Sequence, residues 1–264
     1  MSLPLHLIDA FADGPFSGNP AAVVLLDAAR PDRWMQQVAM EMNQAETAFL
    51  RRQEDGFSLR WFTPNKEVDL CGHATLASAH YVWEERHLDT NTTARFHTRS
   101  GWLSARRDRD QWITLDFPVI TSRPTEPPAN LAAVLGVKPQ EVLRGDFDLM
   151  CVVPDAVTVR QLSPDLAAMA AWDVRGVLVT ASGDERGIDF VSRCFFPAYG
   201  IPEDPVTGSA HCALASYWGR ILGRDEMVGH QASARGGTVR CRLAGGRVEL
   251  TGRAVTTVVG ALQI

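Results

Sequence analysis

The chain has 264 residues, of which 45% are hydrophobic and 22% charged, and its formal net charge is −5. This composition is typical of a folded, soluble protein, and the negative balance gives no reason to expect nucleic acid as a partner. There is no basic leader followed by a long apolar stretch and no run of about 20 apolar residues, so we expect neither export nor a membrane span. Five irregularly spaced cysteines favour reduced thiols in a cytoplasmic protein.

The first half reads as a strand-rich α/β unit. Short apolar runs that alternate or carry β-branched and aromatic residues are separated by turn-forming residues, which is the pattern of strands. Apolar residues at helical spacing, Trp34, Val38 and Met42, predict a helix over residues 30–43. The predicted strands of this half lie within residues 5–11, 21–26, 45–50, 57–63 and 112–117.

A linker is predicted near the middle of the chain. Four prolines fall within residues 118–128, a composition typical of a connection between domains. The two domains would be residues 1–117 and 118–264, and the last strand could cross back to the first domain. Gly245 and Gly246 predict the turn of a hairpin near the C-terminus. In the second half, the predicted strands lie within residues 147–154, 176–182 and 188–197, and the predicted helices within 130–136 and 163–172.

One stretch of the sequence is repeated. The residues DLCGHATLASAHY (69–81) return in altered form as PVTGSAHCALASY (205–217), at a constant offset of 136. We interpret the repeat as a duplicated unit with an alanine-rich, buried helix that begins near Gly72 in one copy and near Gly208 in the other. The free N–H groups and the dipole at each helix start attract an anion. Two such starts facing one cleft would hold the carboxylate of a substrate.

Ionisable and hydroxyl residues at the helix starts and in one predicted strand are candidates for chemistry. Glu46 could act as a general acid and base, and His73 could polarise a substrate or shuttle a proton. The alternatives are structural: Glu46 could face solvent, and His73 could bond to nearby backbone. Asp204 could be a helix-start charge and Ser209 a helix cap, roles that are compatible with substrate contact. The alanine-rich helices themselves could be purely structural.

Other arrangements of reactive residues are not supported. Ser209 and His211 lie two residues apart on a predicted helix, about 200° around its axis, so they form no local nucleophile and base pair. The cysteines and histidines near the helix starts lack the spacing of a closed zinc site. No glycine-rich phosphate loop of the Walker or Rossmann type is present. We therefore expect neither a metal nor a cofactor.

Four ordered motifs of the chain resemble the PhzF-like family, named for an isomerase of phenazine biosynthesis. The resemblance covers nearly the whole chain. It implies an α+β fold of two pseudo-symmetric domains, each a β-barrel-like sheet wrapped around a central helix, as in diaminopimelate epimerase and proline racemase. It also implies an active site between the domains and a homodimer. The four motifs are DAFADGPFSGNPAAV (9–23), NQAETAFL (43–50), RWFTPNKEVDLCGHAT (60–75) and EDPVTGSAHCAL (203–214).

The resemblance also assigns site residues by position. The family's catalytic acid and base falls on Glu46, and its other site residues fall on His73, Asp204 and Ser209. Asn19 matches a position that lines the same cleft.

One of two further positions separates this chain from the epimerase and racemase relatives. Those relatives use a cysteine at the start of each central helix, and Cys71 and Thr207 hold these positions here. One thiol of the pair is missing, so we do not expect two-cysteine racemisation.

The expected function is that of a cofactor-independent isomerase, which moves a proton between carbons of a small carboxylate-bearing substrate. Glu46 would transfer the proton, and His73 and Asp204 would hold or polarise the substrate. Ser209 and the helix-start amides of Gly72 and Gly208 would bind its carboxylate. One alternative is an epimerase or racemase that uses Cys71 together with Glu46. Another is a protein of the same fold that binds a small acid or a partner without turnover.

Overall fold

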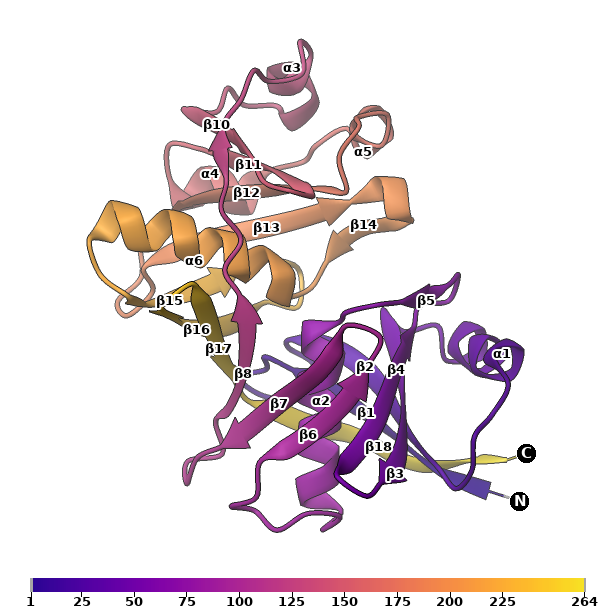
Figure 1. Cartoon of the computed structure of the whole chain (residues 1–264). Helices are drawn as coiled ribbons and strands as arrows, with labels where there is room; N and C mark the ends of the chain where they lie inside the picture. Colours follow the sequence, from indigo (N-terminus) through magenta and orange to yellow (C-terminus); the bar gives the residue numbers. More distant parts are fainter. Residues whose placement is uncertain (1, 264) are drawn as a thin grey trace. The chain divides into compact units, whose positions relative to one another are not determined.

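The structure, a computed structural model, describes residues 2–263 and divides into two compact units. Unit 1 contains the residues up to Asp116 and those from Thr251 onward, and unit 2 contains Phe117–Leu250. Each unit consists of β-strands around one long helix (Figure 1), which confirms the predicted α+β class. Among residues 2–263, no helix is both long and apolar enough to cross a membrane.

Unit 1 is built around α2. The strand β1 pairs antiparallel with both β2 and β18, so the end of the chain belongs to this unit. Strand β2 runs parallel to β3, β3 antiparallel to β4, and β4 parallel to β6. The elements are β1 (Ser2–Ala10), β2 (Asn19–Leu26), α1 (Asp32–Met42), β3 (Glu46–Gln53), β4 (Gly56–Phe62), β5 (Glu67–Val68), α2 (Gly72–Glu84), β6 (Ala94–Thr98), β7 (Gly101–Arg107), β8 (Ile113–Pro118) and β18 (Ala254–Gln263).

Unit 2 is built in the same way around α6. Strand β11 runs parallel to β12, β12 antiparallel to β13, and β13 parallel to β15. Its elements are β9 (Arg123–Pro124), α3 (Leu131–Leu135), β10 (Glu141–Arg144), β11 (Asp148–Val152), α4 (Ala156–Gln161), α5 (Leu166–Met169), β12 (Gly176–Ser182), β13 (Phe190–Phe196), the 3-10 turn η1 (Pro197–Tyr199), β14 (Ile201–Asp204), α6 (Gly208–Leu222), β15 (Glu226–Gln231), β16 (Gly237–Ala244) and β17 (Arg247–Gly252).

The strand pairings repeat from one unit to the other. In unit 1, β4 pairs antiparallel with the short β5, which leads into α2. In unit 2, β13 pairs antiparallel with the short β14, which leads into α6. Strand β18 pairs with β1 as β9 pairs with β10. The sequence repeat is therefore one part of a pseudo-symmetric fold in which nearly every strand has a counterpart.

The central helices are buried because their side chains are small. Ala74, Ala77 and Ala79 of α2 are fully buried, and α2 contacts β1, β2, β3 and β18. Ala210 and Ala215 of α6 are likewise fully buried, and α6 contacts β15 and β16. Alanine leaves room for strand backbones to approach a helix closely. Each helix begins at the predicted glycine, Gly72 or Gly208.

Most predicted elements are confirmed, and the differences are local. The helix predicted over 30–43 is α1, and the predicted hairpin turns at Gly245 and Gly246, which both have positive φ. The helices predicted within 130–136 and 163–172 are shorter, Leu131–Leu135 and Leu166–Met169. Helix α4 was not predicted, although Asp155 caps it by accepting a hydrogen bond from Thr158 N at 2.7 Å. The proline-rich stretch contains β9 and is therefore not wholly irregular.

Candidate active site

Glu46 begins β3 and faces the side of the strand that packs on α2. Side chains alternate along a strand, so Glu46 shares its side with the fully buried Ala48 and Leu50. Its parallel neighbour β2 places Ala21 opposite Glu46. The Glu46 side chain is 13% exposed, so its carboxylate is largely shielded from water yet remains accessible.

His73, the second residue of α2, lies beside this carboxylate. Its Nε2 is 3.2 Å from Glu46 Oε2, and its side chain is only 6% exposed. Within residues 2–263, however, Nε2 makes no aligned hydrogen bond. Buried polar atoms are normally paired, and catalytic hydrogen bonds often tighten only when substrate binds. The geometry therefore leaves Nε2 able to engage both Glu46 and a substrate atom.

The other ring nitrogen of His73 is held from two sides. Asn19 Nδ2 lies 3.2 Å from Nδ1, and Cys71 Sγ lies 3.5 Å from it. When Asn19 donates its amide hydrogen, Nδ1 is the acceptor and the imidazole proton is on Nε2, facing Glu46. A doubly protonated His73 would require the amide to present its oxygen instead. The orientation of the Asn19 amide is thus coupled to the protonation state of His73.

The charges in this cluster are coupled. Burial, together with the nearby Glu46 charge, raises the pKa of the Cys71 thiol to about 11, so it is protonated at neutral pH and a poor nucleophile. Burial alone lowers the pKa of His73, but its neighbours Cys71 and Glu46 outweigh burial and raise that pKa well above its usual value. A buried carboxylate beside an imidazole that holds a proton is an arrangement suited to proton transfer.

A loop that requires glycine at one position places Asn19. Gly18 has a φ of 69°, and a Cβ there would lie 2.3 Å from the carbonyl oxygen of Ala10. Glycine is therefore required for both the backbone conformation and the close approach. The buried Asp9 carboxylate holds the same loop by accepting a hydrogen bond from Phe16 N at 2.9 Å. The next residue, Asn19, begins β2 and is fully buried.

Glu46, Cys71 and His73 also form a potential metal-ligand cluster, since one ligand atom of each lies within 4.8 Å of the others. A histidine ligates a metal through one ring nitrogen, in the plane of the ring. Here Nδ1 approaches Cys71 and Nε2 approaches Glu46, so the ring lies between the two side chains. This geometry fits a chain of polar contacts better than three ligands around one ion. The metal-free site stays a prediction.

In unit 2, Asp204 is embedded in a buried polar network. It ends β14 and is 8% exposed. The Thr207 hydroxyl donates a short hydrogen bond to its carboxylate. The fully buried Gln231 accepts a hydrogen bond from Thr207 N at 2.9 Å and donates to the Asp204 carbonyl at 2.7 Å. These bonds fix Asp204 beside the start of α6.

Ser209 is bonded to Arg175, a residue that the sequence did not predict for the site. Arg175 Nη2 donates to Ser209 Oγ at 3.2 Å and also to the Asp148 carboxylate, which Nε contacts at 2.8 Å. Because Ser209 Oγ accepts this bond, its own hydroxyl hydrogen can be donated to another group. Asp148 lies opposite Gly176 on parallel strands, which brings it beside Arg175. Without this register the pair cannot be identified from the sequence.

Both central helices begin without a side-chain cap. Cys71 and Thr207 occupy the N-cap positions in extended conformations, and neither side chain forms a capping hydrogen bond to its helix. The first helical bonds run from Thr75 N to Cys71 O and from His211 N to Thr207 O. The preceding N–H groups therefore have no acceptor within the helix, which is the property of an anion site.

The predicted site residues fall into two groups, each within one unit. Asn19 and Glu46 both contact His73 in unit 1, next to Gly72. Asp204, Gly208 and Ser209 adjoin the start of α6 in unit 2. Ser209 and His211 have different partners: Ser209 Oγ accepts from Arg175, and His211 Nδ1 contacts the Thr207 carbonyl at 2.8 Å. Burial lowers the pKa of His211 to about 4, so it is neutral at physiological pH.

Three residues that bond to the predicted ones, directly or through Arg175, were not identified from the sequence: Arg175, Asp148 and Gln231.

Comparisons with known proteins agree on one family. The family model for the phenazine biosynthesis-like protein matches residues 8–260. An uncharacterized isomerase of Halalkalibacterium halodurans is 48% identical over 267 residues, and the alignment covers 100% of both chains. The crystal structure of a phenazine biosynthesis protein of the PhzF family from Enterococcus faecalis matches with a TM-score of 0.96 and 42% identity over 100% of both chains.

A more distant likeness concerns the fold alone. A hydroxyproline epimerase of Agrobacterium vitis, solved with bound trans-4-hydroxy-L-proline, matches with a TM-score of 0.64 at 11% identity. The match covers 99% of this chain and 92% of the epimerase. The pseudo-symmetric architecture is therefore shared with an epimerase.

Proposed function

Since the chain belongs to the phenazine biosynthesis-like protein family, we propose that it is an isomerase that moves a proton between two carbons of a small carboxylate-bearing substrate. The family resemblance read from the sequence motifs is confirmed. The relative from Halalkalibacterium halodurans, which aligns over the whole chain, is named an isomerase. The observation that carries the proposal is the buried contact between Glu46 and His73 at 3.2 Å.

Glu46 is proposed as the group that transfers the proton. Its carboxylate takes a proton from an activated carbon, and the electron pair of that C–H bond moves into the adjoining unsaturated system of the substrate. The protonated Glu46 then delivers a proton at another carbon, which restores the carboxylate. No oxidant or reductant is required, and partial shielding from water favours such transfer.

His73 is proposed to stabilise the charge that develops on the substrate. Its Nε2 lacks an aligned hydrogen bond within the described residues, so a substrate oxygen can become its partner. Asn19 and Cys71 keep the ring oriented through Nδ1. Asn19 is therefore proposed to act through His73 and to line the site.

The substrate carboxylate is proposed to bind at the helix starts. The Ser209 hydroxyl, which accepts from Arg175, can donate outward to an anion. The uncapped amides at Gly72 and Gly208 supply further donors and the positive ends of the helix dipoles. We propose that Asp204 acts on the same substrate as Glu46 and that the enzyme works without a cofactor as a homodimer.

The alternative epimerase that uses Cys71 with Glu46 is less well supported. A base must be deprotonated to accept a proton, and a thiol with a pKa of about 11 is almost entirely protonated at neutral pH. A protein that binds a small acid without turnover would not need a proton-holding histidine beside a buried carboxylate. Exchange of substrate hydrogen with solvent separates the proposal from the non-catalytic binding protein. The product, a shifted double bond or an inverted stereocentre, separates the proposal from the epimerase.

The test is deuterium exchange in heavy water. The protein is incubated with a panel of small unsaturated and amino carboxylic acids, and loss of C–H signals is followed by proton NMR. We expect the wild type to exchange and isomerise at least one acid, and Glu46→Gln to lose both reactions because an amide cannot accept and return the proton. Glu41→Gln, which changes an exposed glutamate on α1, is the matched control and should keep full activity. Equal exchange by wild type and Glu46→Gln would refute the role of Glu46.

A further inference from the structure

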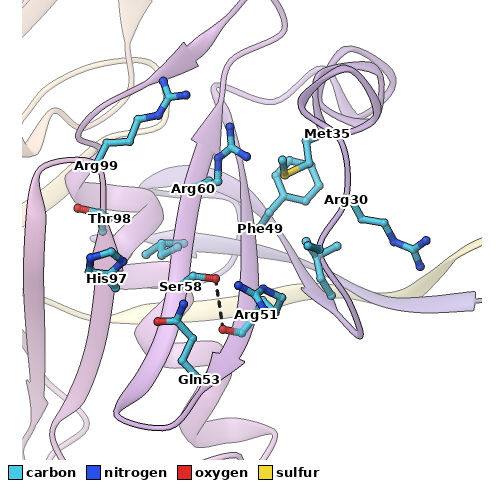
Figure 2. Close-up of a pocket in the computed structure, with 13 residues that line it drawn as sticks. Arg30, Met35, Phe49, Arg51, Gln53, Ser58, Arg60, His97, Thr98 and Arg99 are labelled. Carbon is cyan, nitrogen blue, oxygen red and sulfur yellow. Dashed lines mark hydrogen bonds between the residues drawn. The ribbon is translucent and has the colours of Figure 1, made fainter.

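A pocket of about 330 Å³ lies in unit 1 and is lined in part by β3 and β4 (Figure 2). Phe49, Arg51 and Gln53 of β3 line the pocket. Because side chains alternate along a strand, these three lie on the face of the sheet opposite Glu46. None of the proposed site residues lines this pocket. It is therefore distinct from the candidate active site. The remaining lining residues are Leu26, Ala29, Arg30, Met35, Ser58, Leu59, Arg60, His97, Thr98 and Arg99.

The floor of the pocket is apolar. Leu26, Met35 and Phe49 line it and are at least 93% buried. The same three residues belong to one hydrophobic cluster, against which Trp34 of α1 packs. An apolar group placed on this floor would remove additional hydrocarbon surface from water.

The polar part of the lining is positive. Four arginines line the pocket, and no aspartate or glutamate does. Three of the four are neutralised from outside the lining. Arg60 makes a two-point hydrogen-bonded pair with Glu67 at 2.7 and 2.6 Å, and Arg99 shares the same carboxylate. Arg30 pairs with Asp27 at 2.9 Å.

Arg51 is different from the other three arginines. Among residues 2–263, its guanidinium has no acidic partner, although its backbone carbonyl accepts a bond from Ser58. The Gln53 side-chain amide, two residues on along the same side of β3, also makes no hydrogen bond within the described part of the chain. Both side chains are half-buried. A guanidinium fork and an amide beside an apolar floor are complementary to a planar anion with a hydrocarbon body.

We propose that this pocket is a second small-molecule site, which binds a small anion with an apolar body, such as an aromatic or short-chain carboxylate. Arg51 and Gln53 hold the anionic head, and Leu26, Met35 and Phe49 contact the hydrocarbon part. The volume is at the lower end of the range for ligand sites, so the ligand is small. The proposal is independent of the reaction assigned to Glu46.

The test is a titration of ¹⁵N-labelled full-length protein with benzoate, followed by NMR. We expect chemical-shift changes at residues 49–53, 58–60 and 97–99. Arg51→Gln should weaken the affinity at least about tenfold, because it removes a charge-assisted hydrogen bond. Arg33→Gln, which removes an exposed charge of α1 outside the lining, is the matched control and should change the affinity less than about twofold. Thermal unfolding of both variants verifies that they are folded.

Two further probes define the ligand. If phenyl phosphate binds more tightly than benzoate and changes the chemical shifts of the same residues, the site is supported and its preferred head group is a phosphate ester. Inorganic phosphate that binds as well as benzoate would overturn the apolar contact. Benzoate shifts confined to the neighbourhood of residues 72–73 and 208–209, or equal affinity in wild type and Arg51→Gln, would overturn the second site.

Discussion

His73 is the residue at which burial and charge act against each other. Burial lowers its pKa, whereas Cys71 and Glu46 raise it, and the net result is a folded-state pKa well above the unfolded value. The stability that comes from this pairing is therefore fully present below the unfolded pKa of about 6.5 and is lost as the pH rises through the folded-state pKa. The pairing favours the folded protein most under mildly acidic conditions.

This linkage predicts a pH-dependent difference between wild type and His73→Gln. As the pH rises from the unfolded-state pKa of His73 to its folded-state pKa, the unfolding free energy of the wild type should fall relative to that of the variant. The slope should approach about 1.4 kcal/mol per pH unit for one proton. Urea unfolding at several pH values from 6 to 9 measures this difference. Curves that run parallel over the whole range would show that His73 does not hold an extra proton in the folded state.

Arg175 and Asp148 form the other residue pair with a measurable consequence. The Asp148 side chain is 8% exposed and the Arg175 side chain is 28% exposed, so solvent screens the pair incompletely. Arg175→Gln should lower the unfolding free energy by about 2 kcal/mol, because it leaves a buried carboxylate without its partner. Adding Asp148→Asn should restore part of this loss. Strictly additive effects of the two substitutions, measured by urea unfolding, would show that the pair is not coupled.

Among the elements, the loop between β1 and β2 offers a matched pair of glycines. A Cβ at Gly18 would meet the Ala10 carbonyl oxygen at 2.3 Å in a backbone with φ of 69°, whereas a Cβ at Gly14 would have no heavy atom within 4 Å. Gly18→Ala should therefore lower the unfolding free energy by about 2 kcal/mol or more, and Gly14→Ala by less than about 1 kcal/mol. Gly18→Ala should also displace Asn19. Equal unfolding free energies of the two variants would contradict the requirement for glycine at position 18.

Element prediction succeeded where the sequence pattern is long and repeated. The alanine-rich repeat located the starts of α2 and α6, and the spacing of Trp34, Val38 and Met42 located α1. Prediction from the sequence was less accurate for short elements that are held mainly by tertiary contacts. Helices α3 and α5 end after one turn or little more, since a helix of this length gains little from its own hydrogen bonds.

For the whole molecule, strand register is the information that the sequence lacks. Glu46 and His73 are 27 positions apart in the sequence and are in contact in the fold. From the sequence pattern alone, Glu46 could equally have faced solvent. The family resemblance named this residue, but not its contacts with the imidazole. Asp148 lies beside Arg175 because β11 and β12 are parallel with Asp148 opposite Gly176, and Arg175 also donates to Ser209. The parallel pairings of β2 with β3 and of β11 with β12 join strands far apart in the sequence, and no local sequence pattern indicates them.

The repeated pairing scheme gives the two units equivalent positions with different chemistry. The second residue of each central helix, His73 or Ser209, contacts a charged side chain that begins or immediately precedes a strand of a parallel pair. In unit 1 this partner is the carboxylate of Glu46, and in unit 2 it is the guanidinium of Arg175. This difference supports the proposed roles, proton transfer in unit 1 and anion binding in unit 2.

The central claim is that Glu46, and not Cys71, transfers the substrate proton. The measurement that tests it most directly is the rate of solvent deuterium incorporation into the isomerised acid, compared between Glu46→Gln and Cys71→Ser. We expect Glu46→Gln to reduce the rate by about 10³-fold or more and Cys71→Ser to reduce it less than about tenfold, because the thiol is protonated at neutral pH. The reverse ranking would contradict the account and assign the proton transfer to the thiol.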